Sequence, residues 1–358
     1  MTWENGTWGE RRAGRVTIGD VARTAGVSVA TVSKVINNRH GVAEATTARV
    51  RDVIEQLGYE SSLVATSLRR GRTDVIGVLV AEFEPFSTEV LKGVSQALSG
   101  TGYGLLAYSA MVGDPEGAGW ERRSLARLAG TLIDGAIIVT PTVQVPATPV
   151  PVVAIDQHTG PAETATIDSD NVGGARAATD HLLGLGHRRI GHLRGRVDLA
   201  SAHQRERGYR EALEGAGIAF DPDLVRDGGY RPEPTDGAVR ELLALSEPPT
   251  AIFAANDLSA LRTIEVARDL GLRVPQDLSV VGFDNVPETA ASTPPLTTVA
   301  QPLHDIGTGA VQLLIEMLAG RELKTPHRHL PARLVVRDST SGPRRTGAVL
   351  KPVARGRA

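Results

Sequence analysis

The sequence predicts an α/β protein in which a small helical domain precedes a larger core of parallel β-sheets. Two observations support this fold class. Two short amphipathic helical runs meet at a sharp turn within residues 17–38, and apolar runs of strand length alternate with helical segments from residue 74 to about 340. At 358 residues, the chain is long enough for two or more domains.

The segment TIGDVARTAGVSVATVSKVINN has the pattern of a helix-turn-helix. We expect Thr17 to cap the first helix, with Asp20 as its capping-box partner. Gly26 supplies a permissive backbone at the turn, and Ser28 is expected to cap the second helix. An inward apolar stripe in that helix leaves an outer face of Val29, Ala30, Ser33, Lys34 and Asn37.

This outer face is small, polar and singly basic, which suits the floor of the DNA major groove. A helical hairpin in an ordinary all-α protein has the same pattern, so the motif alone leaves that alternative open. Charge favours DNA: residues 1–72 hold eleven Lys/Arg and seven Asp/Glu, whereas the whole chain has a net charge of −2. Residues 1–15 are expected to be a disordered tail whose arginines add phosphate contacts.

The match extends past the hairpin. Residues 16–80 resemble the N-terminus of the lactose-repressor family of bacterial transcription regulators, through VTIGDVARTAGVS, TVSKVIN, RVRDVIEQLGY, VATSLRRGRT and IGV. The resemblance implies a DNA-binding domain over 16–60, in which Val29, Ala30 and Lys34 read bases. Its third helix has Ala43 where the family usually has a capping Ser, a loss of about 1 kcal/mol. The implied DNA-facing residues are Thr17, Ser28, Val29, Ala30, Thr31, Ser33, Lys34, Asn37, Leu68 and Arg69.

Residues 61–73 resemble the hinge helix and linker of that family, which orders when two subunits meet over DNA. Ten residues cannot sustain a helix alone in water. The resemblance makes Leu68 a wedge that enters the minor groove, with Arg69 beside it. A plain linker whose Leu packs on the next domain is the alternative. The family often has Pro-Asn where this chain has Ser61-Ser62.

From residue 74 to 340 the apolar runs predict parallel strands covered on both faces and arranged in two similar halves. The strand candidates are VIGVLVA, YGLLAYS, GAIIVTP, PVVAID, RIGHLRG, TAIFAAN, LSVVGFD and RLVVRD. The family resemblance continues through DHLLGLGHRRIGHLRG, FAANDLSALRTIEVARDLGLRVPQDLSVVGFDN and PPLTTVAQP. It implies a two-lobed core like that of periplasmic binding proteins, with crossovers near 168–170, 297–301 and 323–326.

Polar residues follow several strand candidates at their carboxyl ends, where open parallel sheets bind ligands. Carboxylates, an amide and an arginine that converge on one cleft suit a ligand rich in hydroxyls, with aromatic rings covering its apolar faces. The resemblance supports an effector-binding set of Phe86, Asp156, Arg205, Tyr230, Asn256 and Asp284. In place of the family's Asn before Pro85 this chain has Glu84, which changes the rim of the pocket.

Structural roles compete with these assignments. Either Asn256 or Asp257 must cap the helix that starts near Leu258. Asp284 is also placed to turn the chain before Pro287, and Arg205 has the alternative of a solvated surface charge. Alignment is looser for Phe86, Asp156 and Tyr230, so packing roles stay open for those three.

Other function classes find little support. Sequence motifs of nucleotide hydrolases, serine hydrolases and zinc peptidases are absent, so we expect no enzyme activity, although Asp156 and Asp284 would suit a carbohydrate enzyme. A phosphate-binding role for GHLRGR is weakly indicated. His181, His187, His192 and His203 lack metal-site spacing, and we expect neither metal nor cofactor.

The chain has no Cys, no signal-peptide core and no stretch that approaches a membrane span, so we expect it in the cytoplasm, away from membranes. A sugar-binding protein of transport or chemoreception would have a nearly identical core but lacks a helix-turn-helix. The family resemblance therefore implies a repressor that binds a near-palindromic DNA operator as a homodimer and responds to a small sugar-like effector. The basic tail over 341–358 lacks leucine heptads, which predicts a dimer without a helical tetramerisation segment.

Overall fold

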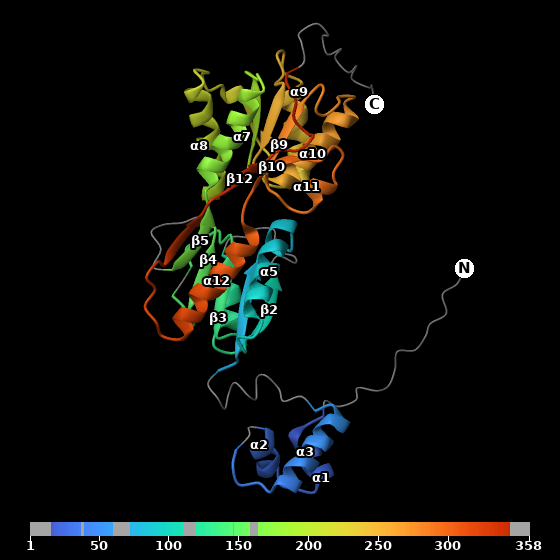
Figure 1. Cartoon of the computed structure of the whole chain (residues 1–358), viewed down its shortest axis with the longest axis vertical. Helices are drawn as coiled ribbons and strands as arrows, with labels where there is room; N and C mark the ends of the chain where they lie inside the picture. Colours follow the sequence, from blue (N-terminus) through green and yellow to red (C-terminus); the bar gives the residue numbers. More distant parts are fainter. Residues whose placement is uncertain are drawn as a thin grey trace, which may run out of the picture. The chain divides into compact units, whose positions relative to one another are not determined.

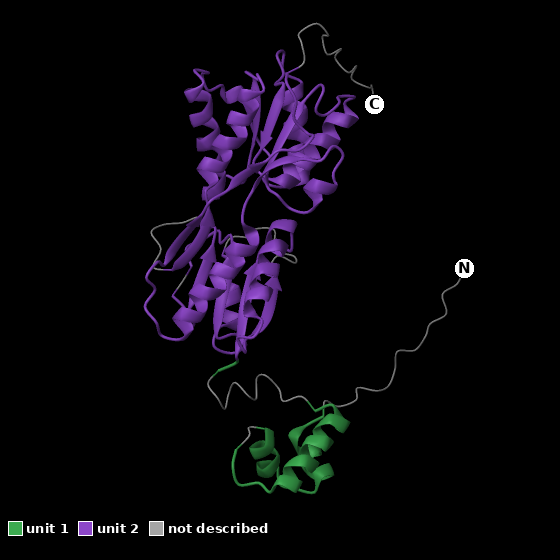
Figure 2. Ribbon diagram, in the orientation of Figure 1, with its two compact units in different colours: residues 1–73 green, residues 74–358 purple. Residues whose placement is uncertain are grey.

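The computed structural model describes residues 16–36, 39–59, 72–109, 119–145, 147–157 and 164–343. Contacts divide the chain into two compact units, residues 1–73 and 74–358 (Figure 2). The predicted fold class is confirmed, because a helical unit is followed by an α/β core with two sheets of mostly parallel strands (Figure 1). Among the described residues, every helix is too short or too polar to cross a lipid bilayer.

The N-terminal unit contains α1 (Ile18–Ala25), α2 (Val29–Ile36) and α3 (Glu44–Leu57). Thr17 and Asp20 form the expected capping box at the start of α1. Gly26 ends that helix with φ at 65°, a left-handed conformation that glycine adopts without strain, and this permits the sharp turn into α2. The three helices bury one shared apolar cluster of Val21, Ala22, Ala25, Val32, Val35, Val50 and Val53.

The first lobe of the core is built on a sheet with the strand order β11-β5-β4-β3-β1-β2, in which every pairing is parallel. Its strands are β1 (Val75–Val80), β2 (Gly104–Ser109), β3 (Gly135–Val139), β4 (Val152–Ile155), β5 (Ala165–Ser169) and β11 (His327–Leu330). Helices α5 (Pro85–Leu98) and α12 (Leu303–Leu318) pack together over one face, and α6 (Trp120–Leu128) covers the other. Strand β1 is buried throughout because its alternate side chains enter both layers.

The second lobe repeats this plan with the order β12-β10-β9-β8-β6-β7, where only β12 runs antiparallel to its neighbour. Its strands are β6 (Ile190–Arg194), β7 (Val225–Asp227), β8 (Ala251–Ala254), β9 (Ser279–Asp284), β10 (Thr297–Ala300) and β12 (Arg333–Val335). Helices α7 (Asn171–Gly184) and α8 (Ala200–Gly215) cover one face, and α9 (Pro232–Leu243) and α10 (Asp257–Asp269) cover the other. Two short helices, η1 (Pro222–Leu224) and α11 (Glu288–Ala291), lie in connections.

The chain passes between the lobes from β5 to α7, from β10 to α12, and from β11 to β12. The third passage therefore lies between Leu330 and Arg333, and the expectation of a crossover at 323–326 was wrong. The reason is β11, whose sequence HRHL has no apolar run yet pairs with β5 and keeps the chain in the first lobe until Leu330. Strands β5, β7 and β10 were not among the strand candidates either.

Candidate functional site

Three of the predicted DNA-facing residues, Val29, Ala30 and Lys34, lie on one side of α2. Val29 is 48% exposed, and Ala30 and Lys34 are exposed beside it, while Val32 and Val35 are buried in the helical cluster. The start of α2 is held by Ser28, whose hydroxyl accepts from the backbone N–H of Thr31 at 3.1 Å and lies 2.9 Å from its hydroxyl.

The remaining members of that set differ in position. Ser33 is partly buried, and Thr17 is exposed, where it accepts from the N–H of Asp20 at 3.3 Å. Asn37, Leu68 and Arg69 lie outside the described residues, as does the whole predicted hinge helix.

One pocket between the two lobes of the core is lined by all six predicted effector-binding residues. It contains about 860 Å³ of empty space, its open mouth included, which falls in the range of small-molecule sites. The first lobe contributes Phe86 and Asp156, and the second contributes Arg205, Tyr230, Asn256 and Asp284. Asp156 and Asn256 come just after β4 and β8, and Asp284 is the last residue of β9, so all three lie at the carboxyl ends of strands, as expected from sequence.

Asp156 directly follows β4 and is 5% exposed. Its backbone has a positive φ of 51°, which is uncommon for a residue other than glycine. Its Oδ1 is buried without a hydrogen-bond partner among the described residues. Burial raises the pKa of Asp156 to about 6, although nearby Arg205 opposes the shift. This carboxyl group is therefore available to a ligand.

Arg205 on α8 is 3% exposed, so the alternative of a solvated surface charge is excluded. Its Nε donates to Asn171 Oδ1 at 2.8 Å, and its Nη1 donates to the carbonyl of Ala255 and lies 3.5 Å from Asp284 Oδ1. The guanidinium stacks 3.8 Å from the centroid of the Phe283 ring. Nη2 has no hydrogen-bond partner among the described residues, which leaves donors for a ligand.

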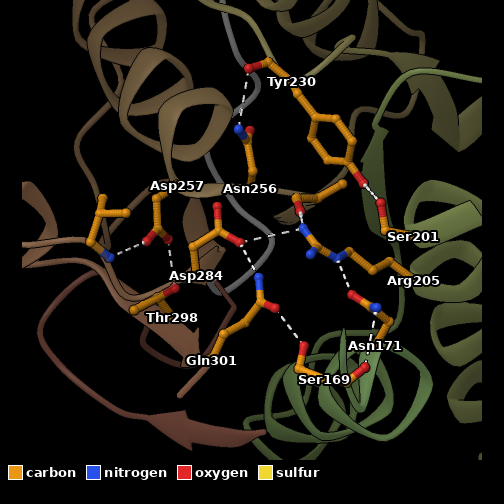
Figure 3. Close-up of polar contacts among 12 residues, drawn as sticks. Ser169, Asn171, Ser201, Arg205, Tyr230, Asn256, Asp257, Asp284, Thr298 and Gln301 are labelled. Carbon is orange, nitrogen blue, oxygen red and sulfur yellow. Dashed lines mark hydrogen bonds and ion pairs between the residues drawn. The ribbon is translucent and has the colours of Figure 1, made fainter. Parts of the chain in front are cut away.

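Asp284 ends β9 and is joined to the passages between the lobes (Figure 3). Gln301 donates from Nε2 to Asp284 Oδ1 at 2.6 Å, and its Oε1 accepts from the hydroxyl of Ser169. Asn171, which holds Arg205, also donates to the carbonyl of Ser169 at 3.2 Å. Burial raises the pKa of Asp284 to about 7, with Arg205 opposing. The pocket floor is thus hydrogen-bonded to two of the three connections between the lobes.

Asn256 is the residue that caps α10, because its Oδ1 accepts from the N–H of Ser259 at 3.0 Å. Its Nδ2 donates to the carbonyl of Tyr230 at 3.2 Å, so only part of its hydrogen-bonding capacity remains for a ligand. Asp257 accepts from the N–H of Val286 at 2.9 Å and from the hydroxyl of Thr298 at 2.5 Å, and it anchors the loop after β9.

Tyr230 places its hydroxyl 3.2 Å from Ser201 Oγ (Figure 3). Its ring covers Gly195, where a Cβ atom would lie only 2.1 Å from a ring carbon. This close approach gives Gly195, the second glycine of GHLRGR, a packing role. Phe86, in the first turn of α5, packs against the first-lobe core while it lines the pocket.

Sequence reasoning missed several lining residues because they lie in loops without a motif. Arg231 Nη2 forms a 2.7 Å ion pair with Glu82 Oε1, which joins the second lobe to the first at the pocket. Thr140 and Thr142 line the wall after β3. The fully buried Glu121 accepts from both the N–H and the hydroxyl of Thr142, and so positions that wall.

Two of the four histidines singled out in the sequence, His187 and His192, have structural environments. His187 bonds Thr250, Ser279 and the carbonyl of Ser341. His192 stacks between two aromatic rings, and burial lowers its pKa to about 4. No cluster of three metal-ligating side chains occurs in the described part of the chain.

A helix-turn-helix unit joined to a two-lobed core with a polar pocket defines a DNA-binding regulator with a small-molecule site. Residues 17–62 match the family model of bacterial regulatory proteins of the lacI family, and residues 179–340 match the periplasmic binding protein-like domain. This chain belongs to the lacI family of bacterial regulatory proteins, and the predicted resemblance is confirmed.

Relatives match over most of their length. The chain is 36% identical to the HTH-type transcriptional repressor PurR of Aliivibrio fischeri, over 91% of this chain and 98% of that one. It is 32% identical to the repressor CytR of Escherichia coli, over 90% and 96%. Among solved structures, a CelR–cellobiose complex matches with a TM-score of 0.69 and 34% identity, over 91% and 100%. The lac repressor dimer bound to operator and an anti-inducer matches with 0.76 and 28%, over 91% and 99%.

Proposed function

We propose that this protein is a transcription repressor that binds a near-palindromic DNA operator as a homodimer, and that a small sugar-like effector in the interlobe pocket changes its affinity for DNA. The observation that carries the proposal is the pocket floor, where Arg205 and Asp284 are hydrogen-bonded to the connections between the lobes. A ligand on that floor acts on the elements about which the lobes move.

On DNA, α2 enters the major groove and Val29, Ala30 and Lys34 face the bases. The two alkyl side chains suit thymine methyl groups, and the ammonium group suits guanine acceptors. A two-fold symmetric dimer requires two inverted half-sites, one per recognition helix. The lac repressor dimer, which was solved with operator, supports this assembly by similarity.

Residues 61–73 connect the DNA-binding unit to the start of the first lobe, and we assign Leu68 and Arg69 to the minor groove. The first lobe begins at Asp74, only a few residues later. In a dimer, a change in how the first lobes of the two subunits face each other therefore changes the distance between their hinge segments. Resemblance to the family supports this step.

In the pocket, Asp156 and Asp284 accept from ligand hydroxyls, Arg205 donates, and the rings of Phe86 and Tyr230 cover apolar faces. The solved CelR complex contains cellobiose, which supports a sugar-like effector here by similarity. Because the two acidic residues come from different lobes, a ligand that reaches both favours the closed arrangement. The effector can change DNA affinity only to the extent that it binds one arrangement of the lobes more tightly than the other. By linkage, DNA binding changes the affinity for the effector by the same factor.

A protein that binds an operator acts in the bacterial cytoplasm, and we infer that location here. The relatives PurR and CytR are named as transcriptional repressors, which supports a role without enzyme activity. We assign Asp156 and Asp284 to hydroxyl recognition instead of glycoside hydrolysis. Turnover of any sugar by the purified protein would contradict this assignment.

Selection of bound sequences from random duplex DNA tests the proposal, with and without a panel of sugars at one fixed salt concentration. We expect an inverted repeat to be enriched and its affinity to shift with one sugar. Recovery of no preferred sequence under any condition would remove the DNA-binding role. An operator that no ligand affects would remove the effector role.

A further inference from the structure

The pocket contains more carboxylates than cations. Its lining includes Glu82, Glu84, Asp156, Asp257 and Asp284 but only Arg196, Arg205 and Arg231 as positive groups. Five acidic residues against three arginines leave a formal excess of two negative charges, as many as the net charge of the whole 358-residue chain.

Each of the three arginines forms its ion pair with a carboxylate other than Asp156 or Glu84. Arg205 pairs with Asp284 at 3.5 Å, and Arg231 pairs with Glu82 at 2.7 Å. Arg196 turns to Asp198, with Nη2 and Oδ2 2.6 Å apart. The carboxyl of Asp257 is satisfied by Val286 and Thr298.

Asp156 and Glu84 remain without an ion pair among the described residues. Asp156 is 5% exposed with its Oδ1 buried and unpartnered, which is costly for a carboxylate unless a ligand supplies the missing partner. Glu84 is the N-cap of α5 and forms a capping box with Ser87, and burial together with nearby Glu82 raises its pKa even though Arg231 and Arg196 act against the shift. Both residues belong to the first lobe and follow strands that flank β3.

Glu84 is also the position where this chain departs from the family pattern, which has Asn before Pro85. A neutral sugar needs only acceptors and donors, and an Asn supplies both. A second carboxylate in a closing, water-poor pocket instead favours a ligand that brings positive charge.

We propose that the effector carries a protonated amino group, as an amino sugar does, and that Asp156 and Glu84 bind it. The proposal rests on the proposed function, namely effector binding in this pocket. Hydroxyls of the same ligand face Arg205 and Asp284 in the second lobe. The ammonium group supplies the hydrogen-bond donors that Asp156 lacks, and its charge offsets both carboxylates.

Calorimetric titration of the full-length protein at pH 7 with matched sugars tests this inference. The pairs are glucosamine with glucose, galactosamine with galactose, and mannosamine with mannose, each at one ionic strength. We expect the amino member of one pair to bind about tenfold tighter or more, because charge-assisted hydrogen bonds are the stronger ones. The N-acetylated sugar of that pair, which keeps the bulk but loses the charge, should bind as weakly as the neutral one.

Two variants at Glu84 test whether the preference for the amine depends on the negative charge of this side chain. Glu84→Asn restores the family residue and Glu84→Gln preserves size, and both should reduce the preference for the amine to a few-fold. Glu211→Gln is the control, because it removes one carboxylate from the exposed, outer part of α8. It should leave the preference unchanged.

The outcomes distinguish the two proposals. A neutral or N-acetylated sugar that binds as tightly as its amine, or an amine preference that survives in both Glu84 variants, would overturn this inference. The proposed effector role would stand if that neutral sugar also shifted operator affinity. Binding of no sugar in the panel would overturn both the inference and the sugar-like effector.

Discussion

Gln301 and Asp284 are joined by a hydrogen bond of 2.6 Å, in which the Gln301 amide donates to a carboxylate at the pocket floor. The same side chain accepts from Ser169, which lies at another connection between the lobes. One amide group thus ties a carboxylate that lines the pocket to two passages of the chain (Figure 3).

Replacing Gln301 with Ala should weaken the coupling between effector binding and operator binding more than it weakens effector binding itself. Asp156 and Arg205 remain, so effector affinity should change by only a few-fold. The effect of the effector on operator affinity should fall by about fivefold or more, in line with a coupling of roughly 1 kcal/mol. DNA titrations with and without effector measure both values. Gln312→Ala, on an exposed position of α12, is the control, and equal behaviour of the two variants would contradict a coupling role.

The ion pair between Glu82 and Arg231 should favour the closed arrangement of the lobes. Both side chains are nearly half exposed, at 44% and 47%, so the pair is worth at most about 1 kcal/mol. Arg231→Gln and Glu82→Gln should each weaken effector binding by about two- to fivefold, and less so at high salt. A double-mutant cycle should show that the two losses are not additive. Full additivity would mean that the pair does not act across the cleft in solution.

The raised pKa of Asp156 predicts a pH-dependent stability. Because the folded pKa is about 6 and the ordinary value is 3.8, the native state binds more protons than the unfolded state between these values. The preferential protonation of Asp156 in the native state therefore adds up to about 3 kcal/mol to the free energy of unfolding. This stabilisation is complete below pH 4 and is lost as pH rises through 6. Asp284, with a pKa of about 7, acts in the same direction.

Denaturant unfolding of the wild type and of Asp156→Asn from pH 4 to 8 measures this effect. The variant should gain relative stability as pH rises, since its amide has no charge to bury. Asp198→Asn, an exposed residue at the ion pair with Arg196, serves as control. If the difference in free energy of unfolding between wild type and Asp156→Asn stayed constant with pH, Asp156 would have the same pKa in the folded and unfolded states.

Lys34→Ala should relax base preference at one position of each half-site, because Lys34 is exposed on the face of α2 that carries Val29 and Ala30. Loss of one base contact corresponds to about 1–3 kcal/mol at that position. Sequence selection on the variant measures the preference. If the preference is unchanged while affinity falls uniformly, Lys34 contacts phosphate instead.

Leu68→Ala should weaken operator binding more than binding to random DNA, since a wedge contributes only where the base step opens. Titration against both DNAs at the same salt concentration gives the ratio. Equal losses on the two would assign residues 61–73 to a plain linker.

Strands with long apolar runs could be predicted from the sequence because burial on both faces requires such runs, as in β1 and β9. Strands β5, β7, β10 and β11 could not. Each of them is short or partly exposed, and its position depends on pairing with a neighbour instead of on its own composition. The error over the third crossover has this cause.

Asp156, Asn256 and Asp284 could be predicted because strand ends in a parallel sheet converge. Arg205, Phe86 and Tyr230 came from the chemistry of a hydroxyl-rich ligand and from family resemblance. The contacts between them could not be predicted. Nothing in the sequence places Arg231 opposite Glu82, and the positive φ of Asp156, which directs its unpartnered carboxyl, depends on the surrounding fold. The capping role of Asn256 was one of two possibilities that only the structure separates.

Neither lobe is a continuous stretch of chain, and this determines the order in which synthesis can complete them. Helix α12 and strand β11, residues 303–330, belong to the first lobe but follow almost all of the second. A nascent chain that has reached Ala300 holds every predicted pocket residue, yet the first-lobe core still lacks Leu303, Ile306 and Leu314. A chain that stops at Ala300 should therefore contain the DNA-binding helices but lack part of its first-lobe core, so the residues after Ala300 decide whether the regulator can respond at all.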